Sequence, residues 1–309
     1  MKRLVLKTIA FLLVAQLVVA LVWRGLVMYP NNYSRLTNEK NVAVQIQRMQ
    51  QIQEPKMVFC GGSGMAYGLS SPTIGEHFKM PVCNTGSHAG LGLRMHLELY
   101  KKFISKGDII IAAEEYQLYF GKVWLGEETV LRILATNYPE GFKDLSLRQQ
   151  LYLFKYVPKA FSDAISVRKL KELWGGVKLN MNECGDLVDE RNTPRSVEGL
   201  RPLKIQERFQ PMALGYLRDF ADYCESKGAT FLIFPPACRH FDFEGNAESV
   251  SMVWKRMEEM GLPIVSTPQE YCFPDTLFCD ASPYHLTNQG VEYRTNKMVR
   301  DIEAYLSNH

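Results

Sequence analysis

The feature that most constrains the fold of this chain is an alternation of short apolar runs with helix-length segments. Apolar runs of four or five residues, each followed by a turn, occur at 56–60, 81–84, 109–113, 230–234 and 263–266. Helical spacing marks the segments 91–105, 212–227, 249–260 and 287–306, the last with Thr287 as its N-cap. Parallel strands need crossover connections of this kind, so the order predicts a doubly wound α/β fold with a five-stranded parallel sheet.

The alternation is interrupted between about residues 116 and 210. This segment holds a leucine-rich and aromatic stretch at 147–157 and a polar stretch at 180–201. We interpret it as a helical insertion that caps one end of the sheet within a single α/β domain, residues 56–309.

The first thirty residues differ in kind from the rest. Basic residues at positions 2, 3 and 7 precede a nearly continuous apolar run from Ile9 to Trp23. A helix from Thr8 to Tyr29 would rise about 33 Å, enough to cross a hydrocarbon core of about 30 Å. We predict a transmembrane signal anchor at 1–30 and a polar stalk at 31–55, which includes a helix leading into the domain. The small residues Val18-Val19-Ala20 leave a cleaved signal peptide as the alternative.

The charge distribution predicts on which side of a membrane the domain lies. The basic flank of the apolar run favours a cytoplasmic N-terminus, so we expect a single-pass membrane protein whose domain is periplasmic or extracellular. The formal net charge is only +3 and basic residues are spread along the chain, so nucleic acid is not an expected partner.

The seven cysteines do not form a recognisable framework. No CxxC pair occurs, which argues against a zinc ribbon or a thioredoxin-type site. Cys60 and Cys83 fall in predicted strands, where they would pack. Cys272 and Cys279 could close a disulfide loop in an exported domain.

The strongest chemical candidates are one serine and one histidine. Ser63 follows the first apolar run between glycines, which let the backbone approach a substrate and leave N–H groups for an oxyanion. A serine hydroxyl needs a base, and the imidazole of His285 titrates near neutral pH. Both residues should lie at the edge where the carboxyl ends of parallel strands meet. The pattern is not the GxSxG elbow, because Met65 occupies the second glycine position.

Three blocks resemble the SGNH or GDSL-like hydrolases, in particular their membrane-anchored O-acyltransferase-like branch. The sequence CGGSGMAYG, from Cys60, is similar to the serine block of that family, with Gly62 in place of its aspartate. Asn84-Thr85-Gly86 is similar to the block that carries an oxyanion glycine, and DASPYHLTNQG, from Asp280, to the final block with its DxxH pair. The resemblance covers 56–115 and 212–305 and implies a flavodoxin-like, SGNH-type domain.

The resemblance also implies residue roles. Ser63 would be the nucleophile, His285 the base and Asp280 the group that orients the imidazole. The backbone N–H groups of Ser63 and Gly86 would bind the oxyanion. Two positions depart from the family pattern: Glu115 follows the third strand, where the family has an asparagine, and Asp280 precedes His285 by five residues instead of three.

The expected function is a serine esterase or O-acyltransferase that acts on an exported or cell-envelope glycan through an acyl-serine intermediate. The resemblance implies a membrane-embedded acyltransferase as partner, and no cofactor or metal is expected. The two departures motivate a second hypothesis, a catalytically inactive scaffold that binds glycan or the membrane acyltransferase.

Two other interpretations have weaker support. Cys238, His240 and Asp242 could suggest a metal site, although a polar loop after the fourth strand is the simpler interpretation. The glycines between 61 and 68 could suggest a phosphate loop, but no lysine followed by serine or threonine accompanies them.

Overall fold

The computed structural model describes residues 37–136, 138–159, 181–188, 191, 202–279 and 282–308, together with a few positions between 3 and 14. Most of the predicted anchor, and Asp280, lie outside the described residues. Among the residues that are described, no helix combines the length and the apolar character that a membrane crossing needs.

The core of the molecule is a parallel sheet of four strands in the order β2-β1-β3-β4. The strands are β1 (Met57–Cys60), β2 (Val82–Asn84), β3 (Ile109–Ala112) and β4 (Thr230–Ile233). The strand order reverses at β1, which pairs with β2 on one side and β3 on the other. Ligands of open α/β sheets bind at such a reversal, beyond the carboxyl ends of the strands.

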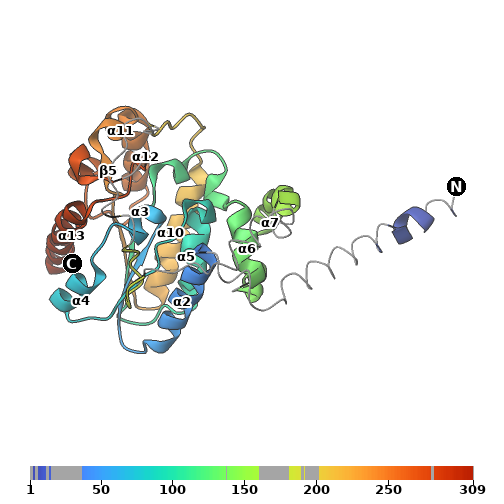
Figure 1. Cartoon of the computed structure of the whole chain (residues 1–309), viewed down its shortest axis with the longest axis horizontal. Helices are drawn as coiled ribbons and strands as arrows, with labels where there is room; N and C mark the ends of the chain where they lie inside the picture. Colours follow the sequence, from blue (N-terminus) through green and yellow to red (C-terminus); the bar gives the residue numbers. More distant parts are fainter. Residues whose placement is uncertain are drawn as a thin grey trace.

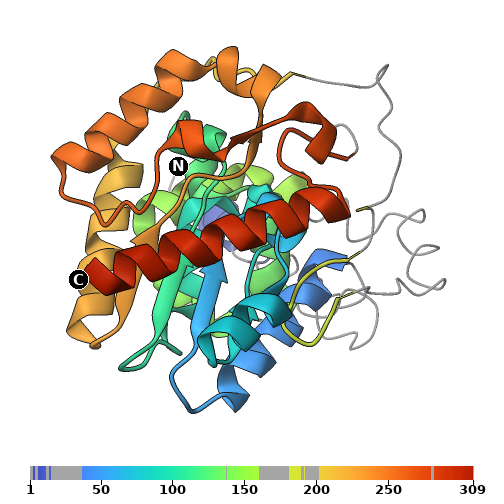
Figure 2. The same ribbon diagram turned by 90° about the vertical axis from the view of Figure 1, so that its left-hand side faces the viewer.

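Helices cover both faces of the sheet (Figures 1 and 2). One face packs against α2 (Thr37–Gln51), α5 (Gly92–Lys101), α10 (Pro211–Ser226) and α12 (Ala247–Glu259). The other packs against α4 (Ser71–Phe78) and α13 (Asn288–Asn308), and α13 crosses in front of the strands in Figure 2.

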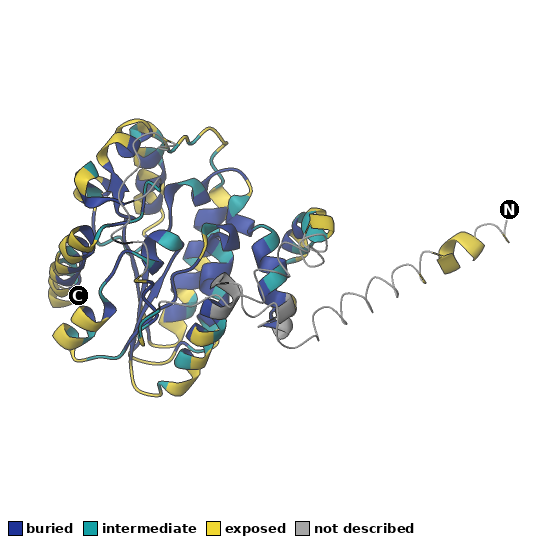
Figure 3. Cartoon of the chain, in the orientation of Figure 1, coloured by how far each residue is buried: buried dark blue, intermediate teal, exposed yellow. Residues whose placement is uncertain are grey.

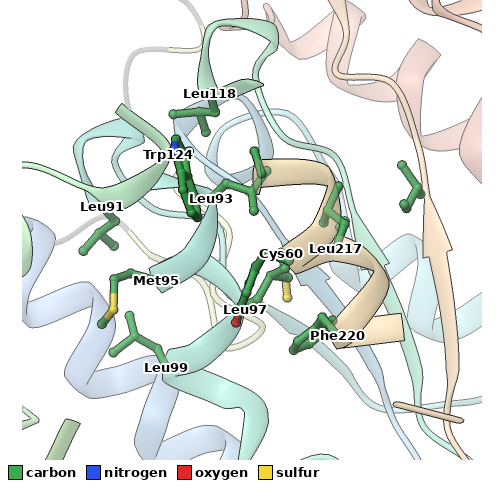
Figure 4. Packing of buried hydrophobic residues seen from close by; sticks show 14 of the residues in the cluster. Cys60, Leu91, Leu93, Met95, Leu97, Leu99, Leu118, Trp124, Leu217 and Phe220 are labelled. Carbon is green, nitrogen blue, oxygen red and sulfur yellow. The ribbon is translucent and has the colours of Figure 1, made fainter. Parts of the chain in front are cut away.

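Two hydrophobic clusters result from the alternation of side chains along each strand. In β1, Val58 and Cys60 belong to the cluster under α5 and α10, whereas Met57 and Phe59 belong to the cluster under α13. Figure 4 shows part of the first cluster, which includes Leu97 of α5 and Phe220 of α10.

The predicted fifth strand at 263–266 is reduced to a single bridge in the structure. Ile264 forms only an isolated parallel bridge with Ile233 of β4. Pro263 has no N–H to donate to a ladder, and the carbonyl of Ser266 accepts from the indole of Trp254 instead. The segment therefore meets the sheet edge at one point without extending the ladder.

The main predicted helices are present with shifted ends. The expected N-cap of α13 is confirmed, because the Thr287 hydroxyl accepts the Gly290 N–H at 3.2 Å. Part of the predicted stalk has a different role: residues 37–51 form α2, whose Val42 and Met49 are buried against the domain.

The inserted segment contains several short helices. They are η3 (Tyr116–Tyr119), η4 (Val123–Leu125), α6 (Glu128–Thr136), η5 (Pro139–Asp144), α7 (Leu147–Leu153) and η6 (Phe154–Tyr156). Residues 160–180 and 192–201 of this segment lie outside the described residues.

The segments around Cys238 and between Cys272 and Cys279 differ from the sequence-based predictions. All seven cysteines are free thiols, so Cys272 and Cys279 do not form the suggested disulfide. Cys238 lies in the short strand β5 (Cys238–Arg239), which pairs with β6 (Cys272–Phe273). The expected polar loop after β4 is instead β5 followed by the helix α11 (His240–Glu244).

Candidate active site

Ser63 lies where the chain leaves β1 and turns into the one-turn helix α3 (Ser63–Ala66). The turn requires Gly61, which has φ +156° and whose Cβ would lie 2.8 Å from the carbonyl oxygen of Ala113. Ser63 itself is partly exposed. Neither its N–H nor its hydroxyl bonds to another described residue, whereas the N–H groups of Met65 and Ala66 both bond to the Gly62 carbonyl.

The loop that carries His285 packs directly on this turn. A Cβ on Gly64 would lie 2.9 Å from the Cβ of Tyr284, so the neighbours of Ser63 and His285 in sequence touch. The imidazole of His285 lies on the ring of Tyr67, with centroids 4.8 Å apart and planes tilted by 37°. Tyr67 follows Ser63 by four residues, and such positions share one face of a helical turn. The structure therefore places the His285 ring against the helical turn that begins at Ser63.

The backbone around His285 is fixed by hydrogen bonds. The carbonyl of His285 accepts the Cys279 N–H at 2.9 Å, and Phe278 and Leu286 form an antiparallel bridge. Asp280, predicted to orient the imidazole, belongs to the intervening loop but lies outside the described residues. Its role stays a prediction.

Glu115 has an unexpected position. Its carboxyl group lies beneath the Ser63 turn, where Oε1 accepts the Gly64 N–H at 3.1 Å. A Cβ on Gly62 would lie 1.9 Å from Oε2 of Glu115 and 2.4 Å from its carboxyl carbon. The carboxyl of Glu115 thus fills the space that a side chain at position 62 would need, and residue 62 must be glycine.

The ionisation of Glu115 is shifted by its surroundings. Burial raises the pKa of Glu115, an effect that the nearby His96 opposes and the neighbouring Glu114 reinforces. The carboxyl therefore carries a proton over a wider pH range than an exposed glutamate. A carboxylate facing the acyl group would repel an oxyanion, but Oε1 of Glu115 accepts the Gly64 N–H below the serine.

Glu114 and His96 form a buried pair beside Glu115. His96 Nδ1 lies 2.7 Å from Oε2 of Glu114, and Nε2 lies 3.1 Å from the carbonyl oxygen of His88. Both ring nitrogens face acceptors, which favours the doubly protonated imidazolium. Burial alone would lower the pKa of His96, but the interactions with Glu114 outweigh it and the pKa is raised.

Gly86 lies behind the serine turn. Its Cβ would be 2.4 Å from the Ala66 nitrogen, so only glycine permits this approach of β2 to α3. The Gly86 N–H donates to Oδ1 of Asn84 at 2.9 Å. Gly86 could therefore donate to an oxyanion only by giving up this bond.

Asn84 joins three parts of the site. Besides accepting from Gly86, its side-chain amide donates to the Met65 carbonyl at 3.1 Å and to Asp186 at 2.8 Å. Asp186 is fully buried and also accepts from the N–H and hydroxyl of Ser71, the first residue of α4. A short piece of the insertion thereby holds β2, α3 and α4 together.

Arg294 supports the serine turn from the side of α13. Its Nη1 donates to the Gly64 carbonyl at 2.7 Å, and the side chain is almost completely buried. Burial lowers the pKa of Arg294 to about 10, which leaves the guanidinium charged at neutral pH. Glu115 and Arg294 thus hold the N–H and the carbonyl of the same residue, Gly64.

Comparisons of the chain with protein-family models, with curated proteins and with solved structures find no match. The site is therefore interpreted from its own geometry and chemistry.

Asp242 and His240, which could have suggested a metal site, instead contact other residues of the chain. Asp242 accepts from Arg239 at 2.5 Å and from the Leu203 N–H at 2.6 Å, both structural contacts. His240 is exposed and lies 3.5 Å from Glu244 on the same helix. Among the described residues, no group of three or more histidine, cysteine or acidic side chains could hold a metal ion.

The sequence pointed to Ser63 and His285 but not to the buried residues that hold the serine turn in place. Ser63 and His285 could be found because each lies in a local motif at a strand or helix end. His96, Asp186 and Arg294 lie on helical or irregular segments with no motif of their own. Their signal is burial of a charged side chain, which appears only in the folded chain.

Proposed function

We propose that the chain is a serine esterase or O-acyltransferase acting on an exported or cell-envelope glycan, with an SGNH-type domain and an acyl-serine intermediate. The observation that carries this proposal is the contact of the His285 ring with Tyr67, one helical turn after Ser63. The close approach of Tyr284 to Gly64 adds support, because it holds the two loops together.

In the proposed reaction, Ser63 Oγ attacks the acyl carbonyl carbon while His285 takes the hydroxyl proton. The tetrahedral intermediate expels the leaving alcohol, which receives that proton from His285, and acyl-Ser63 remains. A second hydroxyl, from a sugar or from water, then loses its proton to His285 and attacks the acyl carbon. The bond between this carbon and Ser63 Oγ breaks, and Oγ takes the proton back from His285. A sugar acceptor gives transfer, and water gives hydrolysis.

The Ser63 N–H is the donor we assign to the oxyanion, since it has no acceptor among the described residues. Glu115 and Arg294 act as positioning residues, because they fix the N–H and carbonyl of Gly64 that follows the serine. Asp280 remains the proposed partner of His285.

The proposed setting is outside the cytoplasm. The apolar run from Ile9 to Trp23 behind basic residues supports a single-pass anchor with an exported domain. An anchored domain of this kind would work beside a membrane-embedded acyltransferase that supplies the acyl group.

The test is fluorophosphonate labelling of the purified full chain, with the modified peptide located by mass spectrometry. Phosphonylation releases fluoride and leaves phosphorus on the nucleophilic oxygen. We expect labelling at Ser63, none in Ser63→Ala, and a fall of at least about a hundredfold in rate in His285→Ala. Ser87→Ala and His88→Ala change a serine and a histidine at the same sheet edge and should label like the parent. Labelling that survives in Ser63→Ala would refute the assignment.

A specific observation favours a second candidate, the catalytically inactive scaffold that binds glycan or the membrane acyltransferase. The Gly86 N–H is bonded to Asn84, and Glu115 replaces the asparagine that the family uses as an oxyanion donor. A folded, monodisperse chain that takes no label at Ser63 would favour the scaffold. The scaffold would also be favoured if cells that carry Ser63→Ala showed none of the defects caused by loss of the whole protein.

A further inference from the structure

The helix α7 buries Leu153, but two of its other apolar side chains and that of Phe154, the first residue of η6, are exposed. Leu147, Leu151 and Phe154 are 71%, 70% and 73% exposed. Gln149, in contrast, is fully buried and donates to the Leu125 carbonyl at 2.8 Å. The three exposed positions follow the spacing i, i+4, i+7 and therefore lie along one face. Exposed apolar side chains grouped in this way mark an interaction surface.

The charged residues around this face are mainly basic. Residues 142–159 contain four basic residues and one acidic residue. The basic ones, all exposed, are Lys143, Arg148, Lys155 and Lys159, and the last of these is paired with Glu128 of α6. The Lys155 ammonium lies 4.0 Å and 4.6 Å from the ring centroids of Tyr152 and Tyr156. Helices that lie in the headgroup region of anionic bilayers typically expose leucine and phenylalanine on one face, with basic residues and tyrosine around it.

The position of α7 agrees with this type of partner. In Figure 1, α7 lies on the side of the molecule away from α13, and Figure 3 shows exposed residues on it. The neighbouring helix α6 contacts α2, which begins at Thr37. The chain from Tyr29, where the predicted membrane helix ends, to Thr37 can span at most about 29 Å. A bilayer that holds the apolar run therefore lies within short reach of the α2 and α6 side.

We propose that α7 and the adjoining Phe142 lie in the headgroup region of an anionic lipid surface. Leu147, Leu151 and Phe154 enter the acyl-chain boundary, and Lys143, Arg148 and Lys155 contact lipid phosphates. This contact is independent of acyl chemistry at Ser63. It fixes the orientation of the domain relative to the membrane, which a single anchor does not do.

The experiment uses the purified full chain in nanodiscs that contain a phospholipid with a photoactivatable acyl chain. We compare phosphatidylcholine alone with a mixture that includes phosphatidylglycerol, and locate lipid adducts by mass spectrometry. Adducts are expected on the peptide 142–159, at least about fivefold more with the anionic lipid. The triple variant Leu147→Ser, Leu151→Ser, Phe154→Ser should lose about tenfold or more of these adducts.

Two further variants separate the contributions. Phe241→Ser removes a side chain that is 61% exposed on α11, and should leave the adducts on 142–159 unchanged. The double variant Lys143→Glu, Lys155→Glu keeps the apolar face and should abolish the preference for anionic lipid. Circular dichroism confirms that each variant is folded.

The proposal is overturned if adducts occur on residues 1–30 but not on 142–159 in either lipid. It is also overturned if the peptide that carries Phe241 is labelled equally. In the first case α7 contacts a protein partner instead, and covalent capture of that partner would be the next measurement.

Discussion

The end of β3 and the face of α7 depart from the usual distribution of residues in opposite ways. Beneath Ser63 the chain buries Glu114, Glu115 and His96, whereas α7 exposes two leucines and the first residue of η6 is an exposed phenylalanine. The buried charges have partners inside the chain: Glu114 pairs with His96, and Glu115 bonds to the Gly64 N–H. The apolar face of α7 is uncovered in the described structure.

The difference distinguishes two kinds of functional region. Burying charged groups costs desolvation free energy, and here specific contacts within the fold offset it, so that region can be complete in the isolated chain. Exposing apolar side chains is offset only when another surface covers them. The serine site should thus depend on contacts among the described residues, and α7 on a surface beyond them. Four predictions test this contrast.

The largest effect is expected for Gly62→Asp. The new side chain would overlap the Glu115 carboxyl, since a Cβ there lies 1.9 Å from Oε2. We expect the free energy of unfolding to fall by about 5 kcal/mol or more, measured by denaturant titration. Adding Glu115→Gly should recover at least half of the loss, because the carboxyl is then supplied from position 62. A stable, fully active Gly62→Asp would show that Glu115 does not occupy this space.

The next effect concerns the buried ion pair. His96→Leu leaves the Glu114 carboxylate buried without its cation and should cost about 3–5 kcal/mol of unfolding free energy. Replacing both residues, as His96→Leu with Glu114→Leu, should cost much less, because two apolar side chains need no pairing. If the double variant is no more stable than His96→Leu alone, the two side chains do not form the pair described.

A smaller effect, visible as a pH dependence, is expected for Glu115→Gln. Because the pKa of Glu115 is raised by burial, the folded chain holds this proton more tightly than the unfolded chain. The parent loses this stabilisation as the pH rises above 4.5 and through the folded pKa. Glutamine cannot ionise, so the stability of the variant relative to the parent should rise with pH over that range. Unfolding curves at a series of pH values measure this, and a flat difference would contradict it.

The smallest effect is expected on α7. Leu151→Gln should change the free energy of unfolding by no more than about 0.5 kcal/mol in detergent, because the side chain is already exposed. Its matched control is Gln149→Leu, which removes the donor to Leu125 and should cost about 1–3 kcal/mol. Equal costs for the two changes would mean that Leu151 packs inside the chain.

Local pattern was sufficient for much of the fold. Four of the five expected strands form the parallel sheet; two of the expected helices, α5 and α10, lie between these strands in the chain, and the other two, α12 and α13, follow β4. Apolar periodicity, glycine turns and the Thr287 cap depend on residues close in sequence, which is why they can be read from it. The predicted fifth strand does not form, because the Ser266 carbonyl bonds to the indole of Trp254 and only Ile264 pairs with β4. These partners are distant in sequence, so local pattern does not reveal them.

The sequence by itself determined the order of the elements and pointed to Ser63 and His285 as candidate reactive groups. Only the tertiary structure decided that Glu115 lies under Gly62, that Asn84 takes the Gly86 N–H, and that α7 buries Gln149 while Leu147 and Leu151 face outward. Each of these outcomes depends on which surfaces meet across long stretches of chain. Burial, hydrogen-bond competition and pKa shifts arise from such contacts, so residue types and spacing do not specify them.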